Sequence, residues 1–421
     1  MIAEILSTGD EIRSGAVIDS NSAYIAQKLE DSGIPVSRHN CTGDDIYSLV
    51  SVLTDIGKRA DIAVVTGGLG PTADDRTAEA AGKAGNVQIE LNNGALNSIK
   101  AFFKTRNRSM RDSDNKQAML PKNSECIYNL AGTAPGFAMK IGNARFFFLP
   151  GVPSEMYKMF SDSVLPQIQK LQGKDKFYCI TKTISSFGLT EAATGEMLSD
   201  LTGLFPDIKL GLRAIFPEIH VKLYANGKNK KKIDLDLANA TRAILQKIGE
   251  KVFSTDESSM EAVIGNLLQR SKTTVAVAES CTGGLIAHRL TNISGSSDYF
   301  LFSGVTYSNK AKETVLGVSS AILKQYGAVH EKTAKEMAER ARRIAKATYG
   351  IATSGIAGPA GGTKDKPVGT VCIGIATPET SKSYRYHFPF SERLKNKTIF
   401  ATTALDLLRR TILNIEQKII F

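Results

Sequence analysis

The residues best suited to covalent chemistry are a serine, a tyrosine and a lysine in the C-terminal third of the chain. Ser280 lies in the segment AESCTGG at 278–284, a pattern typical of a strand, a tight turn and the start of a helix. A serine on such a turn is exposed at a sheet edge, and the N–H groups after it can receive an oxyanion or a phosphate. Tyr307 and Lys310 are spaced to share one side of a helical turn. Since no histidine lies close to Tyr307 and Lys310 in sequence, we expect Lys310 to accept the Ser280 proton, with Tyr307 relaying or orienting it.

Each of these residues also has an ordinary structural interpretation. Serine and threonine after a strand commonly cap the next helix, Lys310 can be a surface lysine, and Tyr307 can lie at the edge of a core. Cys281 is a rival nucleophile, although a small buried cysteine usually serves packing. The turn residues that we expect to contact the substrate are Cys281, Thr282, Gly283 and Gly284.

A second candidate site is the glycine-rich segment TGGLGPTADDRT at 66–77, which follows an apolar run. Gly67, Gly68 and Gly70 leave backbone N–H groups open to a ligand. Pro71 is well placed to start a helix whose N-terminus favours anions. The segment therefore predicts a ligand-binding loop at the end of a strand.

Carboxylates accompany these glycines. Asp74 and Asp75 would repel a phosphate at this loop unless a metal ion bridged them, although a helix dipole alone also favours carboxylates in a first turn. Asp44, in another acidic turn, would meet them where open α/β sheets bind ligands, at the carboxyl ends of the strands. We expect Asp44, Asp74 and Asp75 to hold a divalent metal ion of the Mg, Mn or Co type.

A third glycine-rich segment is TSGIAGPAGG at 353–362. So many glycines cost stability, and they usually serve close backbone approach to a ligand. A phosphate or ribose cradle is the preferred interpretation, and a plain mobile loop is the alternative. The residues that we expect to contact the ligand here are Ser354, Gly355, Gly358 and Gly361.

The elements that must position these residues alternate between strand and helix. This alternation predicts an α/β fold, in which the N-terminal domain is a doubly wound, mostly parallel sheet with helices on both faces. A small α+β module follows, in which the lysine run at 228–232 is expected to be a hairpin tip or loop. A C-terminal α/β domain completes the chain. The expected domain boundaries are 1–168, 169–257 and 258–421.

Composition narrows the classes of function. The chain of 421 residues has 42% hydrophobic and 23% charged residues, which is ordinary for globular domains. Five dispersed cysteines without a CxxC pair argue against a disulfide framework and against a zinc site. No apolar run is long enough to span a membrane, so a soluble, cytoplasmic protein is expected. The net charge of +11 is concentrated in the C-terminal third, which suits an anionic ligand.

Seven motifs, in order along the chain, resemble the competence/damage-inducible protein A (CinA) family. They are GDE at 9–11, TGGLGPTADD at 66–75, GTAPGF at 132–137, PGVPSEM at 150–156, AESCTGG at 278–284, YSNK at 307–310 and GIAGPAGG at 355–362.

The resemblance implies three domains and two activities. It implies an N-terminal domain similar to molybdopterin-binding domains with metal-dependent ADP-ribose pyrophosphatase activity, a KH-like middle domain, and a C-terminal nicotinamide mononucleotide deamidase. On that pattern Ser280 is the nucleophile and Tyr307 and Lys310 are its partners, with no cofactor needed. Asp44 and Asp75 match acidic positions of molybdopterin-binding relatives. The expected ligands are nicotinamide mononucleotide and ADP-ribose, in a homodimer with a role in NAD salvage.

Two alternatives remain open. The N-terminal domain can be a binding module for a pterin or nucleotide without turnover. The chain can also be a nucleic-acid-associated competence factor that uses the KH-like module and the lysines at 228–232. We do not expect nucleic acid as a partner, because the middle segment has no GxxG loop of the kind that KH modules use to clamp nucleotides.

Overall fold

The computed structural model describes residues 1–173 and 177–414, and its contacts divide the chain into two compact units. The first unit comprises Met1–Thr181 and Tyr224–Leu235, and the second comprises Lys182–Leu223 and Asp236–Phe421. Within the described ranges, no helix is both long and apolar enough to cross a membrane.

The N-terminal domain is built on a six-stranded sheet in the order β2-β1-β3-β8-β7-β6. β1 pairs in parallel with β2 and β3, and β3 pairs in parallel with β8, while β7 and β6 are antiparallel. The expectation of a mostly parallel sheet is therefore confirmed. The strands are β1 (Ala3–Thr8), β2 (Val36–Thr42), β3 (Ile62–Thr66), β6 (Glu125–Ile127), β7 (Gly136–Ile141) and β8 (Ala144–Leu149), beside a small pair, β4 (Ile89–Leu91) and β5 (Met119–Pro121).

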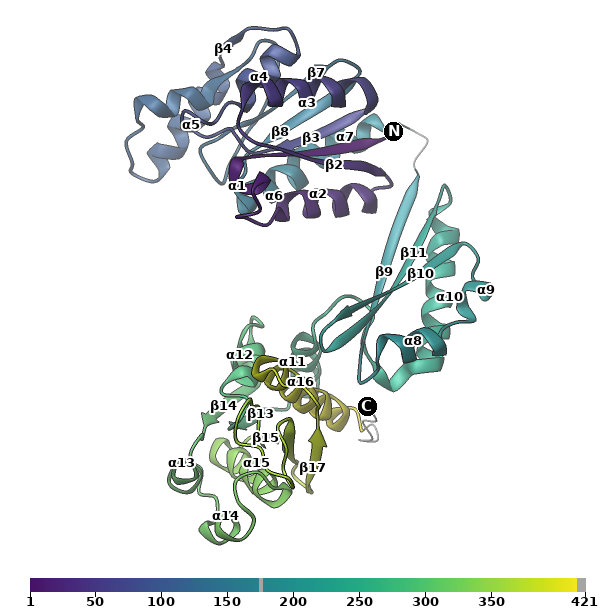
Figure 1. Cartoon of the computed structure of the whole chain (residues 1–421), viewed down its shortest axis with the longest axis vertical. Coiled ribbons are helices and arrows are strands. Elements are labelled where there is room, and N and C mark those ends of the chain that lie inside the picture. Colours follow the sequence, from purple (N-terminus) through teal and green to yellow (C-terminus); the bar gives the residue numbers. More distant parts are fainter. Residues whose placement is uncertain (174–176, 415–421) are drawn as a thin grey trace. The chain divides into compact units, whose positions relative to one another are not determined.

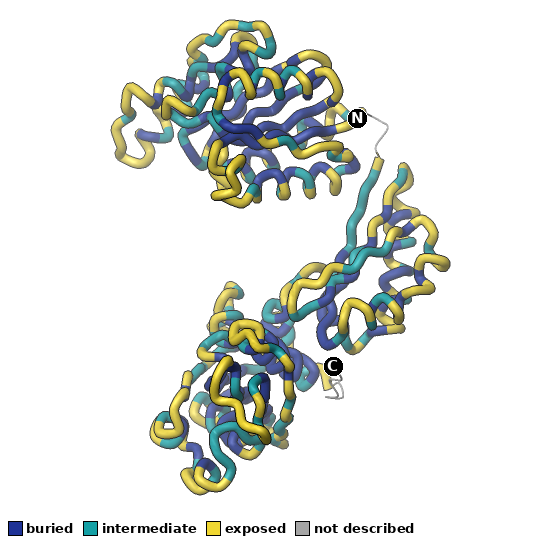
Figure 2. The backbone as a smooth tube through the Cα atoms, in the orientation of Figure 1, coloured by how far each residue is buried: buried dark blue, intermediate teal, exposed yellow. Residues whose placement is uncertain are grey.

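Helices cover both faces of this sheet, as Figure 1 shows. Because side chains alternate along a strand, Leu6 packs toward one helical layer and Ile5 toward the other. Figure 2 shows the strands buried between the two layers. The helices are α1 (Asp10–Arg13), α2 (Ser20–Asp31), α3 (Ile46–Arg59), α4 (Thr77–Ala84), α5 (Asn93–Thr105), α6 (Pro153–Met159) and α7 (Leu165–Leu171), with the helical turns η1 (Asp112–Ala118) and η2 (Phe160–Val164).

The middle module has a four-stranded sheet in the order β10-β11-β9-β12. The lysine run lies at the start of α10, so the expected hairpin tip is wrong for 230–232. The elements are β9 (Tyr178–Phe187), α8 (Glu191–Met197), α9 (Leu201–Leu204), β10 (Ile208–Ile215), β11 (Glu218–Gly227), α10 (Lys230–Ile248), η3 (Gly249–Lys251) and β12 (Val252–Ser254).

The C-terminal domain has a five-stranded sheet in the order β14-β13-β15-β16-β17. β13 lies between β14 and β15 and is parallel to both, which places the carboxyl ends of these three strands at one edge. The strands are β13 (Val275–Glu279), β14 (Phe300–Val305), β15 (Tyr349–Gly355), β16 (Thr370–Ala376) and β17 (Ser381–His387). An α/β domain is confirmed here too.

Helices also cover both faces of the C-terminal sheet. One apolar core joins the sheet to α11, α12 and α16, and another joins it to α15. The helices are α11 (Met260–Ser271), α12 (Leu285–Thr291), α13 (Asn309–Thr314), α14 (Ser320–Tyr326), α15 (Glu331–Ala345) and α16 (Arg393–Ile412), with the turn η4 (Ser296–Asp298). The last seven residues of the expected domain lie outside the described ranges.

Candidate functional site

Ser280 directly follows β13, at the edge where the parallel strands end. Its N–H donates to the Thr353 carbonyl oxygen at 3.0 Å, and only 8% of the residue is exposed. The chain then turns sharply into α12 through Gly283 and Gly284, which have φ values of +60° and +92°. Because L side chains rarely adopt such φ values, the two glycines let the chain turn within four residues and begin α12 at Leu285.

The lysine that contacts Ser280 is Lys312, not Lys310 as expected from the sequence. Lys312 Nζ lies 3.0 Å from Ser280 Oγ, 2.7 Å from the Thr306 carbonyl oxygen and 3.4 Å from the Tyr307 carbonyl oxygen. Lys312 is completely buried, and burial lowers its pKa because the charged form loses its hydration. Ser280 therefore has a buried amine within hydrogen-bond reach.

The difference between the two lysines follows from where α13 begins. The helix starts at Asn309, capped by Ser308, whose hydroxyl accepts the Ala311 N–H. Tyr307 precedes this cap, so the helical spacing assumed for Tyr307 and Lys310 does not apply. Side chains two residues apart on a helix differ by about 200° in direction around the helix axis. Lys312 consequently faces the sheet, while Lys310 is exposed.

Tyr307 does not complete a triad with its hydroxyl. Its side chain is 60% exposed, and its hydroxyl oxygen accepts a hydrogen bond from Arg393 Nη2 at 2.7 Å. What Tyr307 offers to Lys312 is its backbone carbonyl.

The turn after Ser280 offers fewer N–H groups than its sequence suggests. The Gly283 N–H donates to the Ser280 carbonyl oxygen, and the Gly284 N–H donates to the Glu279 carboxylate. Among the turn residues that we expected to bind an oxyanion, Cys281 and Thr282 are those whose N–H groups are not engaged in these bonds. Burial raises the Cys281 pKa to about 12, so this thiol does not compete as an anionic nucleophile.

The glycine-rich segment at 353–362 lies beside this turn. A Cβ atom on Gly355 would come within 3.2 Å of Cys281 Sγ. The Gly358 carbonyl oxygen accepts from Arg393 Nη1 at 2.7 Å, and the Ala357 carbonyl oxygen accepts from Asn396 Nδ2 at 3.0 Å. The start of α16 therefore fixes this segment.

Two further residues of the segment, Ser354 and Gly361, were also expected to contact the ligand. The expected ligand contact of Ser354 is occupied, because its buried hydroxyl donates to the Ala328 carbonyl oxygen. Gly361 has a φ of +91° and lies in the irregular part of the loop.

Sequence reasoning missed two cations at this edge, Arg393 and Lys397. Both lie in the first two turns of α16, which has twenty residues. Lys397 Nζ lies 3.5 Å from where a Cβ atom on Gly283 would be, so the ammonium group is next to the Ser280 turn. The only signal in the sequence was the positive charge of the C-terminal third, which does not single out either residue.

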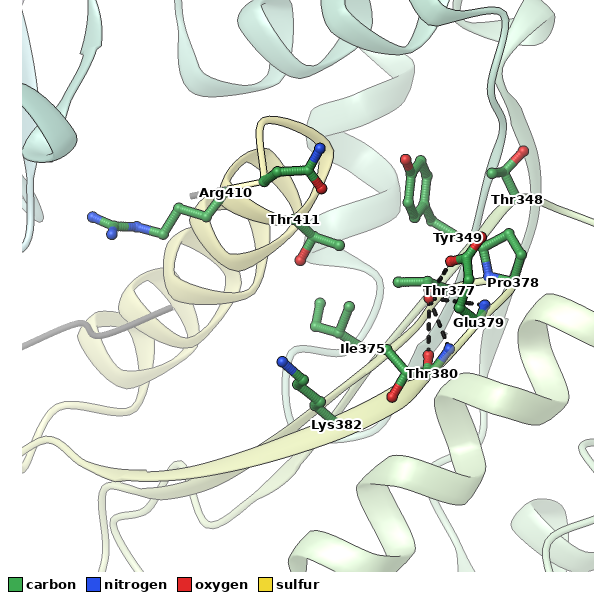
Figure 3. Close-up of a pocket in the computed structure, with 11 residues that line it drawn as sticks. Thr348, Tyr349, Ile375, Thr377, Pro378, Glu379, Thr380, Lys382, Arg410 and Thr411 are labelled. Atoms are coloured by element: carbon green, nitrogen blue, oxygen red, sulfur yellow. Dashed lines mark hydrogen bonds between the residues drawn. The ribbon is translucent and has the colours of Figure 1, made fainter. Parts of the chain in front are cut away.

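The cavity drawn in Figure 3 lies away from this chemistry. It has a volume of about 600 Å³ and is lined by the start of β15, the turn between β16 and β17 and the end of α16. In the figure, Thr377 bonds to Glu379 and Thr380 in that turn. Because β13 and β15 are parallel, this is the sheet edge opposite Ser280.

The N-terminal domain has a cavity of about 470 Å³ at the carboxyl ends of β1, β3 and β8. Gly67, Gly68 and Gly70 line it, as expected. A side chain at Gly67 would collide with the Thr8 carbonyl oxygen at 2.5 Å, and its φ is +104°. No helix begins at Pro71, contrary to expectation, because the segment stays irregular until α4 starts at Thr77.

The wall of this cavity is strongly acidic. Its described lining residues include no lysine, arginine or histidine, but they include the carboxylates of Glu11, Asp19, Asp44, Asp74, Asp75 and Glu155. The Asp44 pKa is raised, chiefly by burial and further by the charges of Asp10, Glu11 and Asp74. The cavity therefore concentrates negative charge.

The three aspartates expected to hold a metal do not form a ligand set. Over residues 1–173 and 177–414, no group of three or more His, Cys, Asp or Glu side chains is arranged to hold a metal ion. The Asp75 carboxylate instead accepts from the backbone N–H and hydroxyl of Thr72. The Asp44 carboxylate accepts from the Asp10 N–H at 3.2 Å. The residues present thus do not fit a resident metal centre.

Three families match successive parts of the chain. They are the probable molybdopterin binding domain over residues 4–170, the damage-inducible protein CinA KH domain over 181–254 and the CinA C-terminal domain over 257–412. A CinA-like protein of Desulfosudis oleivorans is 49% identical over 98% of this chain and 100% of its own length. The chain belongs to the CinA family.

Other CinA-like proteins extend the comparison. One from Desulforapulum autotrophicum is 47% identical over 98% of this chain and 99% of its own length. A solved competence/damage-inducible protein from Agrobacterium tumefaciens is 35% identical over 37% of this chain and 93% of its own, with a TM-score of 0.36. The resemblance drawn from the motifs is confirmed at the level of the CinA family and its domains.

Proposed function

We propose that the C-terminal domain hydrolyses the carboxamide of nicotinamide mononucleotide to give nicotinate mononucleotide and ammonia. The observation that carries this proposal is the buried contact of 3.0 Å between Lys312 Nζ and Ser280 Oγ. An amide is a poor electrophile, and a serine attacks it only when a base within hydrogen-bond reach removes the hydroxyl proton.

The contacts of Lys312 can be made by a neutral amine, which is the form that would act as a base. A neutral amine has two N–H donors and one lone pair, and the carbonyl oxygens of Thr306 and Tyr307 can only accept. An ammonium would donate to Ser280 Oγ and to both carbonyls. In the neutral form, the two N–H groups donate to the carbonyls and the lone pair accepts from the Ser280 hydroxyl. The lowered pKa of Lys312 favours this neutral state.

The reaction then follows in two halves. Ser280 Oγ bonds to the carboxamide carbon while Lys312 takes its proton, and the resulting oxyanion lies toward the N–H groups of Cys281 and Thr282. The C–N bond breaks, and Lys312 returns the proton to the departing nitrogen, which leaves as ammonia. Water attacks the acyl-serine with Lys312 again as the base, and Ser280 leaves with the proton.

The nucleotide phosphate would bind at the same sheet edge. Arg393 and Lys397 supply positive charge there, and the glycine-rich segment at 353–362 allows close approach of backbone N–H groups. Lys397 forms no ion pair with a described carboxylate, which leaves its charge available to an anion. The position of these groups supports a substrate with an amide at one end and a phosphate at the other.

Ammonia release from nicotinamide mononucleotide by the intact protein and by Ser280→Ala tests this proposal. Release that disappears in the variant supports the assignment. Release of equal rate from both proteins, or from neither, contradicts it.

For the N-terminal domain we propose hydrolysis of the pyrophosphate of ADP-ribose, presented as its complex with a divalent cation. The acidic wall supports this form of the substrate, because the described lining residues offer no side-chain cation to a free diphosphate. Both proposed substrates are breakdown products of NAD, so a salvage role in the cytoplasm is part of the proposal. ADP-ribose that binds tightly without forming product would favour a binding module instead.

A homodimer is also proposed, and sedimentation of the intact protein at micromolar concentration tests it. Salt-sensitive RNA binding that is lost when the lysines at 228–232 are replaced would favour the nucleic-acid alternative.

A further inference from the structure

Glu279 is the residue before Ser280, and its side chain is completely buried. One carboxylate oxygen accepts from the N–H groups of Gly284 and Ile286, at 2.9 and 3.2 Å, and the other accepts from the Ala287 N–H at 2.9 Å. The Glu279 backbone carbonyl accepts from the Thr306 N–H at 2.8 Å. Glu279 therefore joins β13, the Ser280 turn, α12 and the end of β14.

A buried carboxylate is costly unless its charge is compensated. No lysine or arginine of the described residues forms an ion pair with Glu279, so the three N–H groups provide the compensation. The first turn of any helix leaves N–H groups without intrahelical partners, and the residue before α12 is Gly284, which has no side chain to cap them. Glu279 fills that role from across the turn.

The position of this carboxylate has a consequence for the nucleophile. The turn at 280–284 is closed by two hydrogen bonds, one from the Gly283 N–H to the Ser280 carbonyl and one from the Gly284 N–H to Glu279. The second bond depends on the carboxylate, and it closes the turn in which Ser280 lies.

We propose that Glu279 is a positioning residue for the proposed amide hydrolysis. Its carboxylate holds the turn so that Ser280 Oγ stays within hydrogen-bond distance of Lys312 Nζ. It also accepts from the first N–H groups of α12, which leaves the N–H groups of Cys281 and Thr282 for the oxyanion. The inference rests on the proposed function only in that Ser280 is the nucleophile.

A carboxylate is required because both of its oxygens accept. Glutamine has one acceptor oxygen, and its amide nitrogen would face an N–H group that also donates. Glu279→Gln should therefore keep the volume of the side chain and still disturb the turn. Glu279→Ala removes the acceptors altogether and leaves a space of carboxylate size between three N–H groups.

The experiment compares Glu279→Ala and Glu279→Gln with a cap variant elsewhere in the same domain. Ser259→Ala is the matched control, because the Ser259 hydroxyl accepts from the Ala262 N–H at the start of α11 without touching the turn. For each protein, kcat and KM of ammonia release are measured, together with the rate at which a fluorophosphonate labels Ser280. Formate and its neutral analogue formamide are then added to Glu279→Ala.

We expect both Glu279 variants to lower kcat and the labelling rate by about 100-fold, which is the loss in rate expected when a reacting group is slightly displaced. KM should change little. Ser259→Ala should leave kcat and labelling within about twofold, because a lost cap costs only stability. Formate should raise the activity of Glu279→Ala at least about tenfold, and formamide should not. A hydrogen bond to a charged acceptor is about twice as strong as one to a neutral acceptor.

Three results would overturn the inference: labelling and kcat of both Glu279 variants close to wild type, an equal loss in Ser259→Ala, or restoration by formamide as strong as by formate. If Glu279→Ala does not fold, Glu279→Gln decides through kcat and labelling. Labelling needs no substrate, so labelling that depends on Glu279 in a protein that releases no ammonia would sustain the inference and refute the deamidase.

Discussion

The N-terminal and C-terminal domains place their polar residues at the same edge of similar sheets, but they fill that edge in opposite ways. In the C-terminal domain, Lys312 is buried against Ser280, and the carboxylate nearest to the turn, Glu279, is compensated by three N–H groups. In the N-terminal domain, six carboxylates line the cavity and the described wall has no cation.

The two sites therefore differ in what each would need to support the reaction proposed for it. The C-terminal site holds a serine beside a buried lysine, so the hydrolysis proposed for it depends on how the fold desolvates that lysine. The N-terminal site is lined by carboxylates, and burial together with the neighbouring negative charges raises the Asp44 pKa. The anionic substrate proposed for it would therefore have to enter with a cation. The two sites should therefore respond differently to chelators, pH and charge substitutions.

The largest expected difference is the response to EDTA. ADP-ribose hydrolysis should fall by at least about 100-fold, because the substrate then lacks the cation that the acidic wall requires. Ammonia release from nicotinamide mononucleotide should not change. Both activities are measured in one preparation. ADP-ribose hydrolysis that persists in EDTA would contradict the proposed dependence of the N-terminal site on a divalent cation.

The second difference is the response to pH. Because burial lowers the Lys312 pKa, the amine is protonated and inactive below that pKa and able to accept a proton above it. The kcat/KM of ammonia release should rise about tenfold per pH unit and reach its plateau below the ordinary lysine value of 10.5. A profile that is flat across this range would show that no lysine acts as the base.

A smaller effect is expected at Lys397. Replacement by methionine should raise the KM for nicotinamide mononucleotide by about tenfold, since a charged hydrogen bond to phosphate is worth about 1.5–3 kcal/mol, and should leave kcat within about threefold. Lys395→Met is the control, because Lys395 lies in the first turn of the same helix and its exposed ammonium pairs with Glu392. Equal KM values for the two variants would remove Lys397 from the phosphate site.

The smallest effect is expected at Asp44. Its pKa is raised in the folded protein, so the unfolded chain ionises more readily and stability falls as pH rises past the ordinary value of 3.8. Asp44→Asn should raise the free energy of unfolding at pH 7 by less than about 1 kcal/mol, and the gain should vanish near pH 3. Urea denaturation at both pH values measures this, and a loss of stability at pH 7 would contradict the account.

The sequence predicted the sheets well because buried strands carry continuous apolar runs. The apolar run before the glycine-rich segment at 66–77 corresponds to β3, and the turn after β13 was found from its Ser-Cys-Thr-Gly-Gly pattern. The elements that were missed are governed by tertiary contacts. The segment after Pro71 offers a helix start by composition, yet it remains irregular around the cavity until Thr77.

The site was predicted only in part, and the lysine shows why. Lys310 and Lys312 lie on one short helix and differ only in which face they occupy, and that face is set by the Ser308 cap. A shift of two residues in the helix start would rotate the face by about 200° and exchange the buried lysine for the exposed one. Likewise, Arg393 and Lys397 reach the site only because α16 begins beside the glycine-rich segment, about one hundred residues after Ser280 in the chain.

The most direct test of the Ser280–Lys312 pair is ammonia release from nicotinamide mononucleotide by Lys312→Met, with Lys310→Met as the matched control. We expect Lys312→Met to lower kcat by about 10³-fold, as when a general base is removed, while Lys310→Met retains wild-type turnover. Loss of activity in Lys310→Met with normal turnover in Lys312→Met would contradict it.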